Sequence, residues 1–215
     1  METFKIAVSR YCLDQKIPQG SDLWPRFNAS FDNYELDAGY IMRAVYQGRA
    51  ITTWHKCNWR TSENFLCGQH IGLDFDNGDK TSSLPQLVQD KFIAKYAAFV
   101  YTTISHTEDC PRARAIFTLD IPIMQAKNYT LATASLLWLF GTADRQCKDA
   151  VRFFYGVSGC KFEYFGNVLP LDVVKKLIAN YQETDQQEKR KTSNKDYHTP
   201  ASQQEVAETL HCIDP

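Results

Sequence analysis

Short apolar segments typical of β-strands alternate with segments of helical periodicity over residues 1–181, and this alternation restricts the fold more than any other feature. The strand candidates are residues 4–10, 50–56, 70–76, 97–106, 112–120, 151–155 and 161–167. The helix candidates are residues 34–46, 84–96, 126–140 and 172–181. No internal repeat accompanies the alternation. The pattern predicts an α/β (α+β) arrangement with one main sheet.

The composition sets the size of the core and limits the kind of partner. With 215 residues, of which 44% are hydrophobic and 13% aromatic, the chain can bury one substantial core. Lys and Arg number 24 against 25 Asp and Glu, which gives a net charge of -1. A uniformly basic nucleic-acid-binding surface is therefore excluded, and any contact with nucleic acid must be a local patch.

The seven cysteines include no CxxC pair, which indicates reduced thiols and a cytoplasmic location. A zinc site could be imagined from Cys57, Cys67, His55 and His70. Their spacing lacks the tight pair that structural zinc sites use, so no structural zinc is expected. No apolar run approaches the ~20 residues that a membrane-spanning helix needs, so we expect a soluble protein without membrane contact.

The composition changes after residue 181, where residues 182–199 are polar and charged with almost no apolar anchor. Such a segment is typical of a linker, and the predicted organisation is a catalytic domain over residues 1–181 and a charged linker over 182–200. Ser202 and Glu205 then have capping-box spacing before further apolar residues. Residues 201–215 are therefore predicted to begin a truncated helical module, and the natural protein is expected to continue.

The sharpest motif is the segment HIGLDFDNG, residues 70–78, an apolar strand that ends in Asp74 and Asp76. Side chains two residues apart on a strand share a face, so the two carboxylates would project together. Clustered carboxylates repel each other unless a cation lies between them, and hard oxygen ligands suit Mg²⁺ or Mn²⁺. The alternative from this motif alone is a strand followed by a polar Asp-Asn-Gly turn.

A second motif, TISHT at residues 103–107, places Ser105 and His106 at the end of an apolar strand, where both can donate to a phosphate. Next, PRARAIF places Arg112 and Arg114 on one face of the following strand. Paired guanidinium groups suit a polyphosphate. The alternative is an exposed strand edge with solvated charges.

A two-metal site needs a third carboxylate, because two leave the ions under-coordinated. Asp120 ends the Arg112 strand in LDIPI, and Asp144 lies just before the aromatic segment that Arg152 opens. Both are candidates. Asp120 could instead cap the turn before Pro122.

The order of LDFD, then Ser-His, then an aspartate resembles the three-motif signature of the archaeo-eukaryotic primase superfamily. The family has an acidic pair spaced by two, a Ser-x-His element and a hydrophobic-Asp element. Here Ser105 directly precedes His106, which departs from the family spacing and leaves the role of Ser105 open. Over residues 50–156 the chain is also similar to primase-polymerase domains of phages, plasmids and mobile elements, which carry Ser-His-Thr, Pro-Arg-x-Arg, Leu-Asp-x-Pro and an Asp about eight residues before an Arg.

This resemblance implies a primase catalytic core, in which an N-terminal αβ module and an RRM-like module share a mainly antiparallel or mixed sheet. It implies a nucleotidyltransferase that makes or extends primers on single-stranded DNA from dNTPs or NTPs with two Mg²⁺ or Mn²⁺ ions. The implied metal ligands are Asp74, Asp76 and Asp144, the last favoured over Asp120, and His106 is a further catalytic residue. The implied nucleotide-binding residues are Ser105, His106, Arg112, Arg114 and Arg152. In the family a helical module, often followed by a helicase domain, comes after the catalytic domain.

Two other functions fit parts of the pattern. A metal-dependent nuclease could use the same aspartates, because two-metal sites also serve hydrolysis. A non-catalytic replication initiator that binds DNA would need a strongly basic face, which the near-neutral charge does not favour. Trp54, Trp59 and Tyr101 could stack against bases, although aromatic residues in a domain of this size more often pack in the core.

Overall fold

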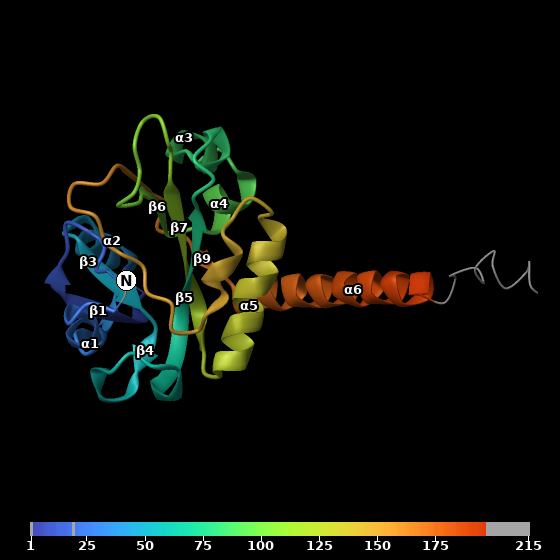
Figure 1. Cartoon of the computed structure of the whole chain (residues 1–215), viewed down its shortest axis with the longest axis horizontal. Coiled ribbons are helices and arrows are strands. Elements are labelled where there is room, and N and C mark those ends of the chain that lie inside the picture. Colours follow the sequence, from blue (N-terminus) through green and yellow to red (C-terminus); the bar gives the residue numbers. More distant parts are fainter. Residues whose placement is uncertain (1, 19, 197–215) are drawn as a thin grey trace, which may run out of the picture. The chain divides into compact units, whose positions relative to one another are not determined.

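The computed structural model describes residues 2–18 and 20–196, and the strands within them form two sheets (Figure 1). The smaller sheet has the order β2-β1-β3 and is antiparallel. Its strands are β1 (Phe4–Cys12), β2 (Phe31–Leu36) and β3 (Arg49–Thr52). Phe4, Ile6 and Val8 on one face of β1 belong to the main core, and Ala7 on the other face belongs to a small second core, so β1 is covered on both sides.

The larger sheet has the order β4-β5-β7-β6-β8, and β9 lies beside β7. Its strands are β4 (Trp54–His55), β5 (Phe65–Phe75), β6 (Phe99–Thr102), β7 (Ala113–Ile123), β8 (Phe162–Tyr164) and β9 (Val168–Leu169). All these pairings are antiparallel except that of β7 with β9. The predicted α+β class is confirmed. The sequence suggested one main sheet, but the described residues form two.

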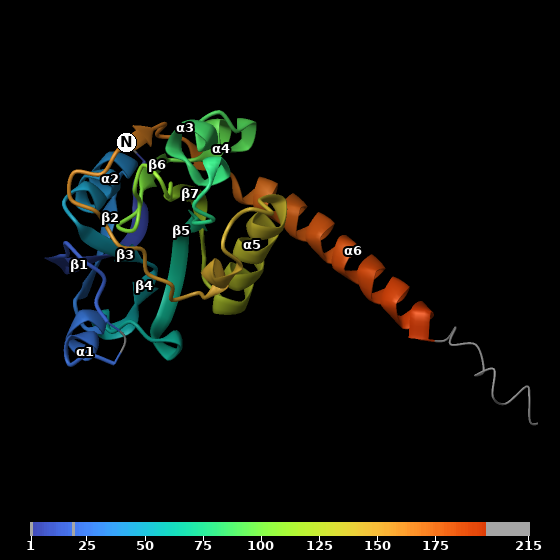
Figure 2. The same ribbon diagram turned by 45° about the horizontal axis from the view of Figure 1, so that its top comes forward.

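The described residues also form helices, of which α5 lies beside β5 (Figures 1 and 2). They are α1 (Leu23–Asn28), α2 (Ala38–Tyr46), α3 (Leu84–Leu87), α4 (Lys91–Tyr96), α5 (Ala126–Leu139) and α6 (Leu171–Asp196). Short 3-10 turns are η1 (Lys56–Asn58), η2 (Ser62–Asn64), η3 (Lys80–Ser82) and η4 (Arg145–Lys148). Tyr129 of α5 donates to the carbonyl of His70 at 2.7 Å, which ties the helix to the middle of β5.

The predicted helix over residues 34–46 is too long. Residues 31–36 instead pair with β1 as β2, and the helix begins only after Asp37. The Asp37 carboxylate accepts the amide of Tyr40, which caps α2 at its first turn. Ile41 and Val45 then share the buried face of α2. The cap rather than the apolar pattern decides where this helix starts.

The predicted strand over residues 151–155 is not a ladder strand. Asp149 accepts the amide of Val151 in a turn, and the following segment makes one antiparallel bridge, between Phe154 and Ile51 of β3. The Phe154 ring packs against β5 at Gly72, where a Cβ would lie 2.5 Å from the ring. The segment therefore joins the smaller sheet to the face of the larger one.

The predicted strand over residues 97–106 also ends early. β6 stops at Thr102, and Thr103 to His106 form a turn in which the His106 amide donates to the Thr103 carbonyl at 2.9 Å. The alternation of faces along a strand therefore does not apply to Ser105 and His106. β7, in contrast, continues past the predicted end at Asp120 as far as Ile123.

The chain divides into two compact units, one ending at Ile178 and the other beginning at Ala179. The structure continues α6 to Asp196, through residues that were predicted to be a linker. The predicted boundary between a catalytic domain and a linker stays a prediction, and the predicted helical module at residues 201–215 lies outside the described residues. No helix in the described part of the chain is both long enough and apolar enough to cross a membrane.

Candidate active site

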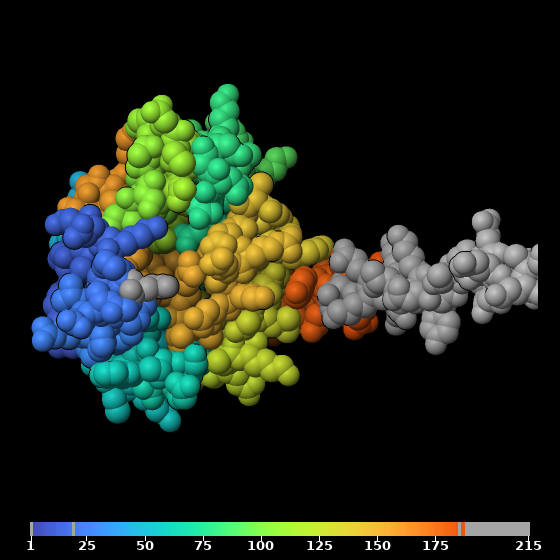
Figure 3. Space-filling view, in the orientation of Figure 1, coloured from blue at the N-terminus to red at the C-terminus, as the bar shows by residue number. Residues whose placement is uncertain are grey.

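A cavity of about 420 Å³ lies in the first unit, and it collects side chains from segments far apart in the sequence. Figure 3 shows a hollow bordered by the blue N-terminal segment, the green segment around residues 103–112 and the orange segment around residue 153. The charged residues singled out in the sequence that line it are Asp74, Asp76, Asp144, Arg112, Arg114 and Arg152. A polar, strongly charged cavity of this kind is suited to a charged ligand.

One side of the cavity is built on three neighbouring strands. Asp74 of β5 and Tyr101 of β6 both lie directly opposite Arg114 of β7, so the three side chains share one face of the sheet. The Arg114 Nε donates to Asp74 Oδ1, and its Nη1 donates to the Tyr101 hydroxyl at 2.6 Å and to the Tyr155 carbonyl at 3.1 Å. We call Asp74, Arg114 and Tyr101 the sheet triad.

Burial and the Asp74–Arg114 pair act in opposite directions on the pKa values of the sheet triad. Asp74 and Arg114 each expose only 7% of their surface, and Tyr101 exposes none. Burial disfavours the carboxylate, but the charge and hydrogen bond of Arg114, with help from Arg152, outweigh it and lower the pKa of Asp74. Burial also disfavours the guanidinium, yet Asp74 and Tyr101 raise the pKa of Arg114. Burial raises the pKa of Tyr101 to about 12. Both ions of the pair therefore stay charged.

The opposite side of the cavity is built on the segment after α5. The Asp144 amide donates to the Asp74 carbonyl at 2.8 Å, which brings this loop to the end of β5. The Asp144 carboxylate accepts the amide of Gln146 and starts η4. Arg152 Nη2 lies 3.6 Å from Asp74 Oδ2 and 3.9 Å from Asp144 Oδ2. We call Asp144 and Arg152 the loop pair.

Cys147 belongs to the site, although no sequence pattern pointed to it. Its buried thiol lies 3.5 Å from Asp74 Oδ2, and ligand atoms of Asp74, Asp144 and Cys147 all lie within 4.8 Å of one another. Burial, and then the charge of Asp74, raise the pKa of the thiol to about 12, so it is a neutral hydrogen-bond donor to the carboxylate. Its place three residues after Asp144, within the turn, is the only local signal that could have indicated it.

The remaining acidic candidates lie in different places. Asp76 follows the last residue of β5, is exposed and lines the cavity. Asp120 is exposed on β7, and its carboxylate accepts the amide of Leu171 at 2.7 Å, at the first residue of α6. Asp144, and not Asp120, is therefore the carboxylate that the fold brings beside Asp74.

Ser105 and Arg112 line the cavity from the loop between β6 and β7. The Arg112 amide donates to His106 Nδ1 at 3.1 Å, which leaves Nε2 as the protonated nitrogen of a neutral imidazole. His106 thus stabilises this loop, and this predicted catalytic residue is not among those that line the cavity. The Arg112 Nε is buried and has no hydrogen-bond partner among the described residues.

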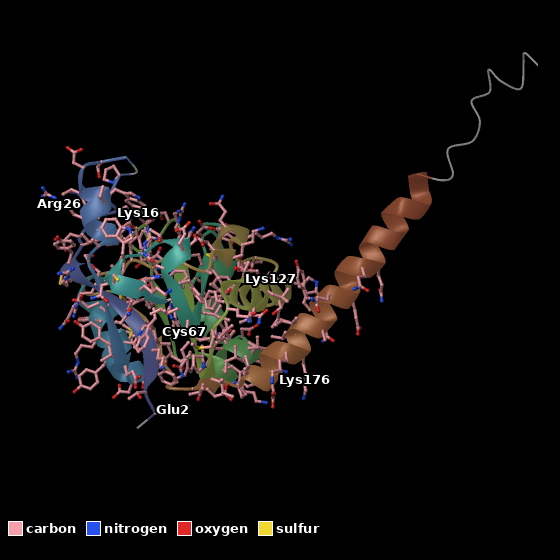
Figure 4. The ribbon with its side chains drawn as sticks, turned by 90° about the horizontal axis from the view of Figure 1, so that it is seen from below. Glu2, Lys16, Arg26, Cys67, Lys127 and Lys176 are labelled. Atoms are coloured by element: carbon pink, nitrogen blue, oxygen red, sulfur yellow. The ribbon has the colours of Figure 1, made fainter. Side chains whose placement is uncertain are left out.

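An N-terminal wall was missed, because Lys16 and Trp24 precede residue 50, where the motif resemblance begins, and Arg60 belongs to none of the motifs. Lys16, Trp24 and Arg60 line the cavity, and the Ile17 amide donates to the Tyr155 hydroxyl at 3.0 Å, which ties this segment to the site. Figure 4 labels Lys16 beside α1. The Arg60 guanidinium lies 4.6 Å from the Phe153 ring centroid.

The three aromatic residues first considered for stacking do not line the cavity. Tyr101 is fully buried, Trp54 donates its indole N–H to the carbonyls of Ile6 and Tyr34, and Trp59 is exposed elsewhere. Trp24 is the tryptophan that the structure places at the cavity. Only tertiary structure could separate it from the other three tryptophans.

The chain was compared with known proteins. No protein-family profile and no curated protein sequence matches it. Among solved structures, it is similar to the AEP domain of the primase-polymerase (PrimPol) of cyanophage S-2L, with 13% sequence identity and a TM-score of 0.48, over 82% of this chain and 89% of that chain. At this degree of likeness, a functional conclusion has to come from the residues of the site.

Proposed function

We propose that this chain is a nucleotidyltransferase of the primase-polymerase type, which joins nucleotides to a primer on a single-stranded DNA template. The observation that carries the proposal is the cavity in which Asp74, Asp76 and Asp144 face Arg112 and Arg152. Carboxylates suit divalent cations, guanidinium groups suit a triphosphate, and nucleotidyl transfer needs both within one cavity. The order of the motifs along the chain supports the same function.

The donors fit Mg²⁺ or Mn²⁺. Asp74 Oδ1 is held by Arg114, so Oδ2 is the oxygen that faces Asp144, and ligand atoms of the two residues lie within 4.8 Å of each other. The exposed Asp76 can complete the oxygen set from the rim of the cavity. Divalent ions held there would activate the 3′-hydroxyl and neutralise charge as pyrophosphate leaves.

The arginines have different roles in this proposal. Arg112 and Arg152 reach the cavity with guanidinium groups that are not enclosed by the sheet, so they bind the triphosphate, with Ser105 as a neutral donor. Arg114 was first expected to bind phosphate as well. Its Nε and Nη1 are already engaged by Asp74, Tyr101 and the Tyr155 carbonyl, so we assign it to holding Asp74 in place. The triphosphate therefore has two arginines rather than three.

The test is extension of a labelled primer on a DNA template with dNTPs and Mn²⁺, comparing Asp144→Asn with Asp120→Asn. Losing one metal-binding carboxylate should lower the rate by roughly two orders of magnitude or more. Asp120→Asn is the matched control, because that carboxylate caps α6 and does not line the cavity. It should keep most of the activity.

Three results would contradict the proposal. Full activity of Asp144→Asn would remove Asp144 from the site, and loss of activity in Asp120→Asn alone would reverse the assignment. Shortening of the primer in the absence of nucleotides, abolished by Asp144→Asn, would instead identify a nuclease built on the same carboxylates.

A further inference from the structure

Arg152 lies at the position where a cation would bind the two carboxylates. Its Nη2 is 3.6 Å from Asp74 Oδ2 and 3.9 Å from Asp144 Oδ2, so one nitrogen contacts both residues. These residues are also the carboxylates whose ligand atoms lie within 4.8 Å of each other. A guanidinium and a divalent ion cannot both occupy the space between the same two oxygens, because their charges repel and their volumes overlap.

The surroundings of Arg152 let its side chain move while its backbone stays in place. The side chain is 34% exposed, and both of its ion-pair distances are long for direct hydrogen bonds. The backbone, in contrast, is anchored, because the Arg152 carbonyl accepts the Thr52 hydroxyl at 3.0 Å and the nearby Phe154 bridges to Ile51. The guanidinium can therefore swing over the cavity without any change in the fold.

The other two cavity arginines of the motifs do not combine these properties. Arg114 is buried and held by three acceptors, so it cannot leave Asp74. Arg112 forms no salt bridge within 4.0 Å among the described residues. Arg152 is thus the cationic side chain that both contacts the two carboxylates and can leave them.

We propose that Arg152 is an exchangeable cation: its guanidinium pairs with Asp74 and Asp144 until a divalent ion takes its place, and it then turns to the triphosphate. This inference rests on the proposed function, since it concerns the ion and nucleotide of the same site. An ion that displaces Arg152 frees a phosphate-binding group, and a triphosphate that holds Arg152 uncovers the carboxylates. Binding of ion and nucleotide is therefore mutually reinforcing.

The exchange and a purely structural role of Arg152 predict opposite changes in the affinity for the divalent ion when Arg152 is replaced. If Arg152 competes with the ion, removing its charge strengthens ion binding. If Arg152 only holds the carboxylates in position, removing it weakens ion binding. A partly exposed ion pair contributes up to about 1 kcal/mol, which corresponds to roughly fivefold in affinity.

The experiment titrates the full chain with Mn²⁺, without nucleotide or DNA, and follows free Mn²⁺ by electron paramagnetic resonance. Arg152→Gln should bind Mn²⁺ about fivefold more tightly than the wild type. Arg112→Gln is the matched control, because it removes a cavity charge that forms no such pair, and it should change the affinity by less than about twofold. Arg152→Lys keeps the charge and should bind Mn²⁺ less tightly than Arg152→Gln.

Two further measurements distinguish a change in Mn²⁺ binding from a variant that has failed to fold. Mn²⁺ should raise the Tm of Arg152→Gln by more than it raises the Tm of the wild type, while affinity for a fluorescent dNTP in the presence of Mn²⁺ falls. Equal or weaker Mn²⁺ binding by Arg152→Gln, beside a wild type that binds Mn²⁺, would overturn the exchange and leave the proposed function standing. No Mn²⁺ binding by the wild type would overturn the ion site and the exchange together.

Discussion

The sheet triad and the loop pair surround the same carboxylate, but they hold it in different ways. Arg114 and Tyr101 are fixed opposite Asp74 by strand register and are almost completely buried. Asp144 and Arg152 come from a segment with a turn and one isolated bridge, and their side chains expose 22% and 34% of their surface. One group therefore makes Asp74 rigid and keeps it charged, while the other leaves its second oxygen open to exchange.

The difference shows that the two sides of a charged cavity can divide stability and function between them. A buried ion pair is strongly destabilising to break, because the surviving charge has no solvent, whereas a half-exposed pair contributes little. We expect substitutions on the sheet side to unfold the protein and substitutions on the loop side to change binding.

The largest effect is expected for Arg114→Leu. It leaves the Asp74 carboxylate buried beside an apolar side chain and removes a partner of the Tyr101 hydroxyl, so we expect a loss of about 3–5 kcal/mol in the free energy of unfolding. Urea denaturation of Arg114→Leu and Arg152→Leu compares the two sides directly. Arg152→Leu should lose about 1 kcal/mol or less. Similar losses in the two variants would break the comparison.

A second effect concerns the middle of β5, four residues before Asp74 on the same face. His70 is fully buried, neither of its ring nitrogens has a partner among the described residues, and burial, with the charge of His55, lowers its pKa to about 4. Burial, with the charge of Arg60, lowers the pKa of His55 to about 4 as well. Unlike Asp74, these groups have no counter-charge to keep them ionised.

The unfolded chain therefore takes up protons first as the pH falls below about 6.5, the ordinary histidine value, and stability is lost from there down to about pH 4. At pH 5 we expect a loss of about 2–4 kcal/mol relative to pH 7. The pKa of Asp74 is lowered, so the stability that this carboxylate contributes is lost only as the pH falls below about 3.8. Denaturation at each pH measures this, and His70→Gln should flatten the curve. An unchanged curve in that variant would remove His70 as the cause.

The third and smallest effect separates the two central carboxylates. Asp74→Asn leaves Arg114 buried with a neutral partner and should cost about 2 kcal/mol, whereas Asp144→Asn can still accept the Gln146 amide and should cost about 0.5 kcal/mol. Both variants should lose primer extension. Thermal unfolding of the two proteins in parallel gives the measurement, and equal Tm values would show that the sheet side is no more structural than the loop side.

Several parts of the site could be predicted from the sequence. The run HIGLDFD is mostly apolar and contains the acidic pair Asp74 and Asp76, so a strand over residues 70–76 was predicted from periodicity, and β5 contains these residues as far as Phe75. The two-residue spacing predicted that Arg112 and Arg114 lie on one side, and both line the cavity, although Arg112 precedes the first residue of β7. The alternation of strands and helices indicated the α+β class, because periodicity is a local property.

Other parts depended on contacts that no local pattern encodes. Residues 31–36 form a strand because they pair with an edge of β1, and α2 therefore begins only after its cap at Asp37. The folded chain alone brings Cys147 to Asp74 and the N-terminal wall around Trp24 to the cavity. In the same way, a backbone hydrogen bond to Asp74 brings Asp144 to the site, whereas the Asp120 carboxylate accepts the Leu171 amide at the start of α6.

The sequence by itself determined which charged residues stand at strand ends, and the tertiary structure decided which charge meets which. Arg112 and Arg114 are of the same residue type, lie two residues apart and line the same cavity. Arg112 has a buried Nε without a partner among the described residues, whereas Arg114 is held by Asp74 and Tyr101. The physical reason is that the partner of a charge is set by strand register and by the loss of solvent around it. Both are properties of neighbours that lie far apart in the chain.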